Sequence, residues 1–265
     1  MTNTKALRAI SLGAAVAAVL SSGVATAEVT ANAAVTNNYI WRGITQTNDD
    51  AAVQGGIDWS GGPGFYVGTW LSNVAFPALA DVSDTATPDL VVDPGTGYEM
   101  DVYAGWGGEA GGFGYDLGII TYQYPVTPNF NFTEVYASGT FNVLTLGLNY
   151  TVDTASGNDA EKNPDSSGAF EEGDVYVYGS LDFPTKAGDL SFYAGSYMFD
   201  NDKKDFSATG GADVGELDYV HYGASWGKGD FTFAVDKNDL DPVINGSSAD
   251  NVRFSVMWSK DFELM

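Results

Sequence analysis

Hydrophobic and polar residues alternate at every second position through most of the chain after residue 27. This alternation is typical of β-strands, in which successive side chains point to opposite faces of a sheet. In the stretch FGYDLGIITYQY, for example, Phe113, Leu117 and Ile119 share one face. No stretch of comparable length shows the apolar period of about 3.6 residues that marks a helix. The pattern therefore predicts an all-β protein.

Alternating segments can be placed at twelve positions, so a sheet of about twelve strands is the expected architecture. Ten or fourteen strands would also fit if one pairing were misassigned. The expected strands are residues 30–42, 51–60, 64–75, 97–107, 112–124, 132–141, 143–152, 174–183, 189–199, 217–227, 229–238 and 251–262.

The connections between these segments are alternately short and long. The short ones are GGPG, GGEAGG, the join near Asn142, PTKAG and KG. The long ones are residues 43–50, 76–96, 125–131, 153–173, 200–216 and 239–250, and they contain about twenty acidic residues. All nine prolines fall in the connections, as expected because proline cannot donate a hydrogen bond within a sheet.

This alternation of short and long connections is typical of an outer-membrane barrel, in which short turns lie on the periplasmic side and long loops lie outside. Soluble sandwiches with Greek-key connections give no strict alternation. The prediction is a transmembrane, antiparallel, up-and-down β-barrel with short periplasmic turns and long acidic extracellular loops. A soluble exported sandwich is the alternative.

The start of the chain has the pattern of a secretory signal peptide. Lys5 and Arg8 precede an apolar run from Ala9 to Leu20, which is too short to span a membrane as a helix. The sequence ATA then gives the expected cleavage site. We therefore expect residues 1–27 to be removed and residues 28–265 to form a barrel in the cell outer membrane, inserted by the barrel assembly machinery.

The composition is strongly acidic, with 35 Asp and Glu against 11 Lys and Arg. The expected signal contains two of the basic residues and no acidic one, so nine basic residues remain and the formal charge is near −26. Such a surface repels nucleic acid and attracts cations. The chain contains no cysteine, which excludes disulfides and thiolate metal sites.

In a membrane barrel, apolar side chains contact lipid and the opposite face lines the interior. The six tryptophans lie near expected strand ends, which favours an aromatic belt at the interfaces: Trp41, Trp59, Trp70, Trp106, Trp226 and Trp258. The parity of each strand then gives the ionisable residues that are expected to line a pore. They are Arg42, Asp58, Glu99, Asp101, Asp116, Glu134, Asp182, His221, Asp236 and Arg253.

The end of the first segment, NNYIWRG, places a cation directly after an apolar stretch. Tyr39 and Trp41 share one parity, and we expect them on the lipid side. Arg42 has the opposite parity and is expected to point inward. Gly43 would then begin the first outer loop.

Seven inward carboxylates against two arginines would be costly in a dry interior, so a wetted, cation-favouring lumen is the simpler interpretation. We therefore expect a channel, surrounded by outer-membrane lipid, for the passive diffusion of small hydrophilic solutes or cations. The alternative is a hydrogen-bonded plug in a non-conducting barrel that has a structural or surface-recognition role.

Other kinds of site have less support in the sequence. His221 is the only histidine, and Ser225 lies about 13 Å further along the same strand, so catalysis is not expected. A serine on a neighbouring strand could still approach His221, which leaves a barrel enzyme as a third alternative. No cofactor is expected. The acidic stretches 81–97 and 200–213 could bind divalent cations, although neither matches a calcium-loop pattern.

The stretch NNYIWRGITQTNDDAAVQGGIDW resembles the opening motif of a known bacterial family. The matching residues are Tyr39, Arg42, Gly43, Thr45 and Gln46, and GFYVGTWLSNV, MDVYAGWGGE and TYQYP…NFTEVYA resemble later blocks of the family. This is the TorF porin family, first described as the uncharacterised proteobacterial Gcw_chp family. The resemblance covers nearly all of the expected mature chain, and it implies an outer-membrane β-barrel with a pore function.

Arg42 and Glu134 stand out among the inward residues, because each lies in a motif that resembles the family. We expect both in the lumen, near the outer half of the barrel. There Arg42 would pair with Glu134 or with another inward acid. A cation fixed at this position would hold the wall and narrow the pore.

Overall fold

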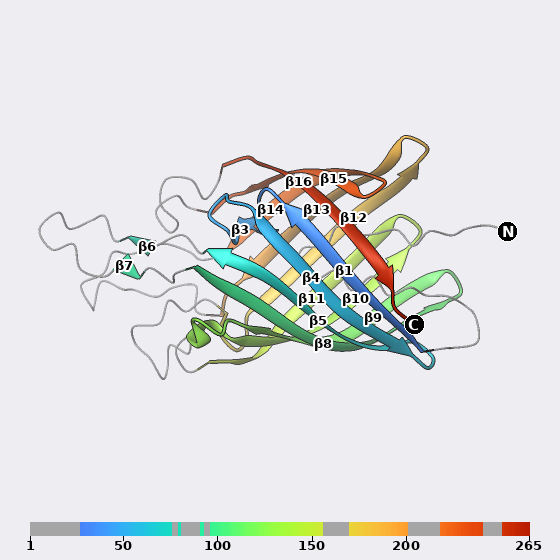
Figure 1. Ribbon diagram of the computed structural model, residues 1–265, viewed down its shortest axis with the longest axis horizontal. Helices are drawn as coiled ribbons and strands as arrows, with labels where there is room; N and C mark the ends of the chain where they lie inside the picture. The colour runs from blue at the N-terminus through green and yellow to red at the C-terminus, as the bar shows by residue number, and fades with distance from the viewer. Residues whose placement is uncertain are drawn as a thin grey trace, which may run out of the picture.

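A computed structural model of the protein describes residues 27–75, 79–80, 91–92, 96–155, 170–200, 218–240 and 251–265. Within these residues, twelve antiparallel strands form one closed barrel, in which the first strand pairs with the last (Figure 1). The strands are β1 (Glu28–Thr36), β4 (Ala52–Gly61), β5 (Phe65–Ala75), β8 (Thr96–Ala110), β9 (Phe113–Gln123), β10 (Phe132–Phe141), β11 (Leu144–Thr154), β12 (Val175–Thr185), β13 (Gly188–Met198), β14 (Tyr219–Lys228), β15 (Phe231–Asn238) and β16 (Arg253–Glu263). The predicted twelve-stranded barrel is confirmed, and the sandwich alternative is wrong.

The strand ends that the short turns join and the strand ends that flank the long connections lie at opposite ends of the barrel, and the C-terminus lies at the short-turn end (Figure 1). The long connections include β2 (Ile40–Trp41), β3 (Ile44–Thr45), β6 (Leu79–Ala80), β7 (Val91–Val92) and the short 3-10 helix η1 (Pro128–Phe130). The expectation that all nine prolines lie in connections is wrong for Pro184. This residue lies near the end of β12 and is paired with Asp189 of β13.

Two predictions concern residues that the structure does not cover. Apart from Ala27, the expected signal peptide lies outside the described residues, and so do most of the acidic stretches 81–97 and 200–213. Their roles stay predictions. In the part of the chain that is described, no helix has the length and apolar character needed to cross a membrane.

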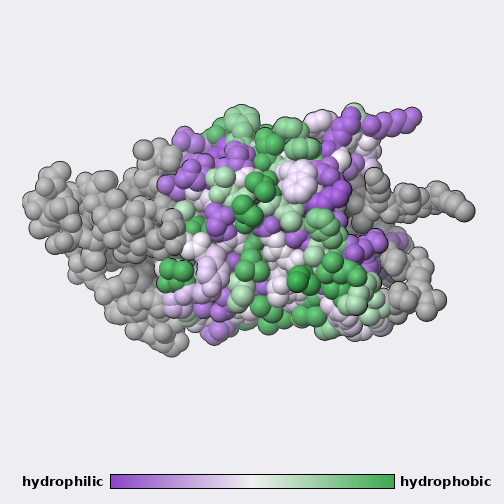
Figure 2. All heavy atoms as spheres, viewed as in Figure 1, coloured by the Kyte–Doolittle hydropathy of each residue, from purple (hydrophilic) through white to green (hydrophobic). Residues whose placement is uncertain are grey.

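The outer face of the barrel is apolar. On β9, Phe113, Leu117 and Ile119 are 47%, 53% and 45% exposed, and Figure 2 shows hydrophobic residues spread over the outer face of the strands. Four tryptophans point outward toward the short-turn end: Trp59, Trp106, Trp226 and Trp258. The expectation that all six form a belt is wrong for Trp41 and Trp70. Trp70 shares the inward parity of Ser72, and Trp41 does not belong to the wall.

The inner face packs tyrosine rings against glycines of neighbouring strands. A Cβ atom at any of these glycines would overlap the facing phenol ring: Gly68 with Tyr103, Gly105 with Tyr66, Gly118 with Tyr136, Gly147 with Tyr178, Gly195 with Tyr176 and Gly223 with Tyr193. Large rings therefore fit inside a narrow barrel because the adjacent strand has no side chain at the contact.

Candidate functional site

The chain leaves the barrel wall after Thr36 and forms a hairpin inside the barrel, residues 37–50, called the inner hairpin below. Its two strands, β2 and β3, pair with each other. Arg42 and Gly43 form the turn between them, with φ angles of 47° and 79°. Positive φ at both central positions is typical of two-residue hairpin turns, and it explains the glycine at the second one.

The inner hairpin contacts strands on different sides of the barrel. The Tyr39 hydroxyl donates a 3.0 Å hydrogen bond to Glu99 on β8. The Asn238 amide on β15 donates a 2.7 Å hydrogen bond to the carbonyl oxygen of Gly43. Because β8 and β15 are not neighbours in the barrel, the hairpin crosses its interior.

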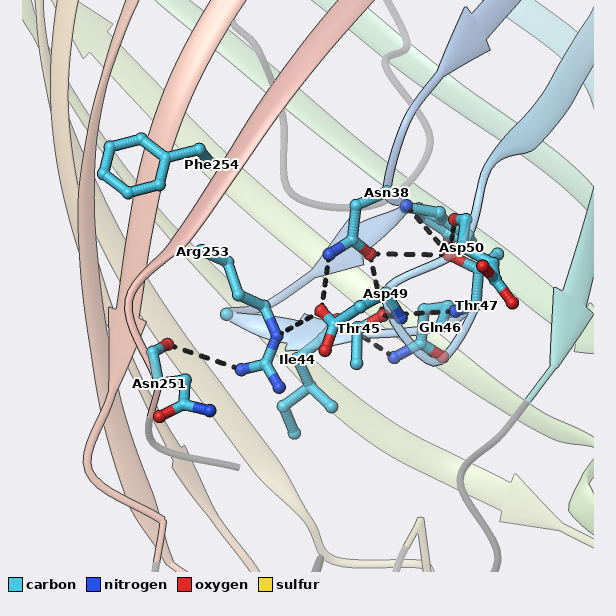
Figure 3. Close-up of polar contacts among 12 residues, drawn as sticks. Asn38, Ile44, Thr45, Gln46, Thr47, Asp49, Asp50, Asn251, Arg253 and Phe254 are labelled. Atoms are coloured by element: carbon cyan, nitrogen blue, oxygen red, sulfur yellow. Dashed lines mark hydrogen bonds and ion pairs between the residues drawn. The ribbon is translucent and has the colours of Figure 1, made fainter. Parts of the chain in front are cut away.

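A polar network holds the base of the inner hairpin against β16 (Figure 3). The Asn38 amide donates to Asp49 at 2.7 Å, and the Thr45 hydroxyl donates to Asn38 Oδ1 at 2.7 Å. Arg253 Nε on β16 donates to the same Asp49 carboxylate at 2.7 Å. The network ties the hairpin to the strand that closes the barrel.

Arg42 occupies a cage of aromatic rings and one carboxylate. Its Nη1 and Nη2 atoms donate hydrogen bonds of 2.8 and 2.6 Å to the two oxygens of Glu134. The guanidinium carbon lies 4.2 Å from the ring centres of Trp41 and Tyr176 and 5.1 Å from that of Tyr197. Two parallel charged hydrogen bonds and desolvated cation–π contacts are the strong forms of both interactions.

Glu134 is positioned by an irregularity in the sheet. The register between β10 and β11 shifts between Thr133 and Glu134, and such bulges redirect side chains next to functional sites. The carboxylate also accepts hydrogen bonds from the Asn149 amide at 2.9 Å and the Tyr122 hydroxyl at 3.3 Å. Of the two expected arrangements, the structure therefore has the direct pair of Arg42 and Glu134, and not a pair of Arg42 with another inward acid.

The expected lipid-side position of Tyr39 and Trp41 is wrong. These side chains are 6% and 5% exposed, and the Trp41 ring contacts Tyr122 and Phe132 inside the barrel. Parity applies only while a strand stays in the wall, and β1 ends at Thr36. For the same reason Gly43 belongs to the hairpin turn rather than to the start of an outer loop.

The other predicted site residues also point inward and form two groups along the barrel. The buried group lies toward the long-connection end: Glu99, Asp101, His221, Asp236 and Arg253. The partly exposed group lies toward the short-turn end: Asp58, Asp116 and Asp182. The inner hairpin therefore fills one half of the interior and leaves the acids of the other half accessible.

Hydroxyl groups, rather than basic side chains, bind most of these acids. The donors are Tyr103 to Asp58, Tyr66 to Asp116, Ser180 and Ser191 to Asp182, and Tyr193 to Asp236. A hydroxyl donor satisfies a lone pair but brings no positive charge. The inner face therefore stays acidic after its hydrogen bonds are formed.

The only histidine is engaged with a tyrosine. His221 Nε2 lies 2.8 Å from the Tyr176 hydroxyl, and Ser225 Oγ has no hydrogen-bond partner among the described residues. The pair thus lacks the contact that would activate a serine nucleophile. No group of three or more His, Cys, Asp or Glu side chains in the described ranges could hold a metal ion.

Solved structures with similar folds have low sequence identity to this chain. One structure, from a study of the in-meso crystallization of membrane proteins, has 7% identity and a TM-score of 0.54 over 89% of this chain and 84% of that chain. The NanC porin has 10% identity and a TM-score of 0.46 over 89% and 100%. The KdgM porin has 10% identity and a TM-score of 0.42 over 88% and 98%. These likenesses concern the fold alone.

No curated protein matches the chain. A family model described as a bacterial protein of unknown function (Gcw_chp) matches residues 21–207. The match covers more than half of the 265 residues and includes the inner hairpin and Glu134. The chain therefore belongs to the Gcw_chp family of bacterial proteins.

Proposed function

We propose that the chain is an outer-membrane channel for the passive diffusion of small hydrophilic solutes, that it favours cations, and that the inner hairpin narrows it. The observation that carries the proposal is the reversed polarity of the barrel. Apolar residues such as Leu117 and Phe254, 53% and 70% exposed, cover the outside, while acids face inward. This arrangement is favourable when lipid lies outside and water lies inside.

The proposed cation preference rests on the charge of the inner face. Asp58, Asp116 and Asp182 are partly exposed inside the barrel, and they accept hydrogen bonds from uncharged hydroxyl and amide groups. Arg42 and Arg253, the inward basic residues of the described wall and hairpin, each bind an acid. Rings of carboxylates favour cations over anions in channels.

Other parts of the proposal concern export and partners. Residues 1–27 would direct export, the barrel assembly machinery would insert the strands, and divalent cations would bind the acidic loops 81–97 and 200–213. The more specific assignment to the TorF porin family, within the Gcw_chp family, is consistent with a channel for small solutes. Selection by charge and size needs neither an enzymatic step nor a cofactor.

Conductance measurements test the channel directly. Residues 28–265, refolded and inserted into planar bilayers, should give discrete single-channel currents. In a KCl gradient, the reversal potential should shift toward the potassium equilibrium potential. Asp116→Asn and Asp182→Asn should reduce this shift, because each removes an accessible carboxylate. A reversal potential on the chloride side would contradict the proposed cation preference.

A second candidate function is a non-conducting barrel with a structural or surface-recognition role. The burial of Arg42 and Glu134, 2% and 1% exposed, favours it, because the hairpin then acts as a permanent plug. Replacing residues 38–50 with a short Gly-Ser linker separates the two functions. Currents in this variant alone identify a plugged barrel, and currents in both proteins support the channel.

A further inference from the structure

Asp101 is a buried acid without a partner. It lies on β8 between Trp70 of β5 and Tyr122 of β9, and its side chain is 0% exposed. Neither of its carboxylate oxygens has a hydrogen-bond partner among the described residues. The other predicted inward acids all accept at least one hydrogen bond, so Asp101 is the exception within this interior.

A second acid lies beside Asp101. Glu99 is two residues earlier on the same face of β8, so the two Cα atoms are about 6.6 Å apart. Its side chain is 1% exposed, and it accepts hydrogen bonds from the hydroxyls of Tyr39, at 3.0 Å, and Tyr124. These phenols bring oxygen atoms, but no positive charge, to the pair of carboxylates.

The two arginines that face the described interior of the barrel each bind an acid other than Asp101 or Glu99. Arg42 forms both of its charged hydrogen bonds with Glu134, and Arg253 binds Asp49. Glu99 and Glu134 both act on Asp101 with like charge. A buried carboxylate without compensation is costly, so a positive charge or a proton has to accompany Asp101.

We propose that Asp101 and Glu99 bind one hard metal cation on the inner face of β8. Two carboxylates, with phenol and water oxygens, match the oxygen ligands that alkali and alkaline-earth ions prefer. Carboxylate and water oxygens, without imidazole or thiolate ligands, suit ions such as Mg²⁺ and Ca²⁺ better than zinc or copper. A role of this site in conduction rests on the proposed cation-favouring channel. The binding of the cation itself does not depend on whether the barrel conducts.

Cation-dependent stability tests the site. The refolded protein is unfolded in urea at constant ionic strength, with N-methylglucamine chloride exchanged stepwise for Na⁺, K⁺, Mg²⁺ or Ca²⁺. At least one metal ion should raise the unfolding midpoint in a saturable manner, because a ligand of the folded state stabilises it. Asp101→Asn should abolish this response, and Glu99→Gln should weaken it.

Asp182→Asn is the matched control. Asp182 is also an inward acid, but both of its oxygens accept 2.6 Å hydrogen bonds, from Ser180 and Ser191. This variant should keep the full response to the metal ion. A response lost equally in Asp182→Asn would overturn the site, because it would report the general charge of the interior.

Infrared spectroscopy of the wild-type protein tests the alternative that a proton, and not a metal cation, neutralises Asp101. It requires no variant, so poor folding of a variant does not affect the result. A wild-type protein that shows no saturable response, together with a carbonyl band of a protonated carboxylic acid, overturns the proposal. Metal binding without single-channel currents would support the metal site and contradict the proposed channel. Currents without metal binding would support the channel and contradict the metal site.

Discussion

Arg42 and Glu134 are 92 positions apart in the sequence, and they form two hydrogen bonds of 2.8 and 2.6 Å inside the barrel. Neither side chain is more than 2% exposed. A buried ion pair adds little net stability, whereas the loss of one partner leaves an uncompensated buried charge. The pair therefore fixes where the inner hairpin lies more than it stabilises the barrel.

Removal of Arg42 should affect both stability and passage. Arg42→Ala leaves Glu134 charged and buried, so the free energy of unfolding should fall by about 3–5 kcal/mol. The hairpin turn also loses its attachment to β10, and single-channel conductance should rise. Urea unfolding and planar-bilayer recordings measure the two effects. Unchanged conductance together with unchanged stability would contradict this role.

A double replacement separates charge from position. Arg42→Met combined with Glu134→Leu removes both charges and keeps apolar volume in the cage. Stability should recover most of the loss seen in Arg42→Ala, because no buried charge is left unpaired. Conductance should stay raised, since the hydrogen bonds to β10 are gone. Equal losses of stability in the single and double variants would rule out the charge as the cause.

Gly43 should be required for the hairpin to dock. Its φ is 79°, and a Cβ atom at this position would overlap His221 on β14. Gly43→Ala should therefore displace the turn from β14 and make the hairpin accessible to protease in detergent. Gly62→Ala is the matched control, because Gly62 has a φ of 61° and open space around it. Equal proteolysis in the two variants would show that strain from a positive φ angle, and not the overlap with His221, causes the cleavage.

The wall of the barrel could be predicted from the sequence because each wall residue obeys a local rule. A strand with lipid on one side and a lumen on the other must alternate, as Phe113, Leu117 and Ile119 do on β9. The short turns follow from residues such as Asn142, whose φ is 58°. The inward direction of every predicted acid followed from the same rule.

The inner hairpin could not be predicted in this way. Parity placed Trp41 outside, because nothing local in NNYIWRG says that β1 ends at Thr36. Asn38 and Asn238 lie in expected strands and Asp49 in an expected connection, and nothing in the sequence marks them as anchors of a hairpin. The bonds from Asn238 to Gly43 and from Arg253 to Asp49 join residues 195 and 204 positions apart. The Arg-Gly pair was the one available signal, since a hairpin turn with two positive φ angles favours glycine.

The tyrosine–glycine contacts predict a large cost for a single added methyl group. A Cβ at Gly118 would overlap the Tyr136 ring and lie 2.6 Å from the carbonyl oxygen of Ala104. Gly118→Ala should lower the free energy of unfolding by about 1–3 kcal/mol. Gly114 lies on the same face of β9, and its Cβ would make only ordinary contacts, with Thr140 at 3.6 Å and with the carbonyl oxygen of Gly108 at 4.0 Å. Gly114→Ala should change stability by less than about 0.5 kcal/mol in the same urea titration.

The proposed membrane location predicts a cost that depends on depth. Leu117 lies at the middle of β9 and Phe113 at its start. In lipid vesicles, Leu117→Arg should lower the free energy of unfolding by about 2–4 kcal/mol, and Phe113→Arg by about 0–1 kcal/mol. Urea unfolding in vesicles measures both. Equal and small effects would contradict a lipid-facing position for Leu117.

Asp174, which precedes β12, should make stability depend on pH. Its carboxylate accepts 2.9 Å hydrogen bonds from the backbone amides of Glu171 and Asp200. Burial raises the pKa of Asp174 to about 7, whereas an unfolded aspartate has a pKa of about 3.9. The folded state therefore holds the proton more tightly, so this group stabilises it fully below about pH 4 and loses that effect as the pH rises through about 7.

Asp174→Asn isolates that contribution. Between about pH 4 and pH 7 the wild-type free energy of unfolding should fall more steeply than that of the variant, because the variant has no carboxyl to ionise. Identical slopes in urea titrations would contradict the expected shift. The carboxyl carbon resonance of Asp174 measures the same quantity without a mutation, and its midpoint should lie near 7 rather than near the value of about 3.9 for an exposed aspartate.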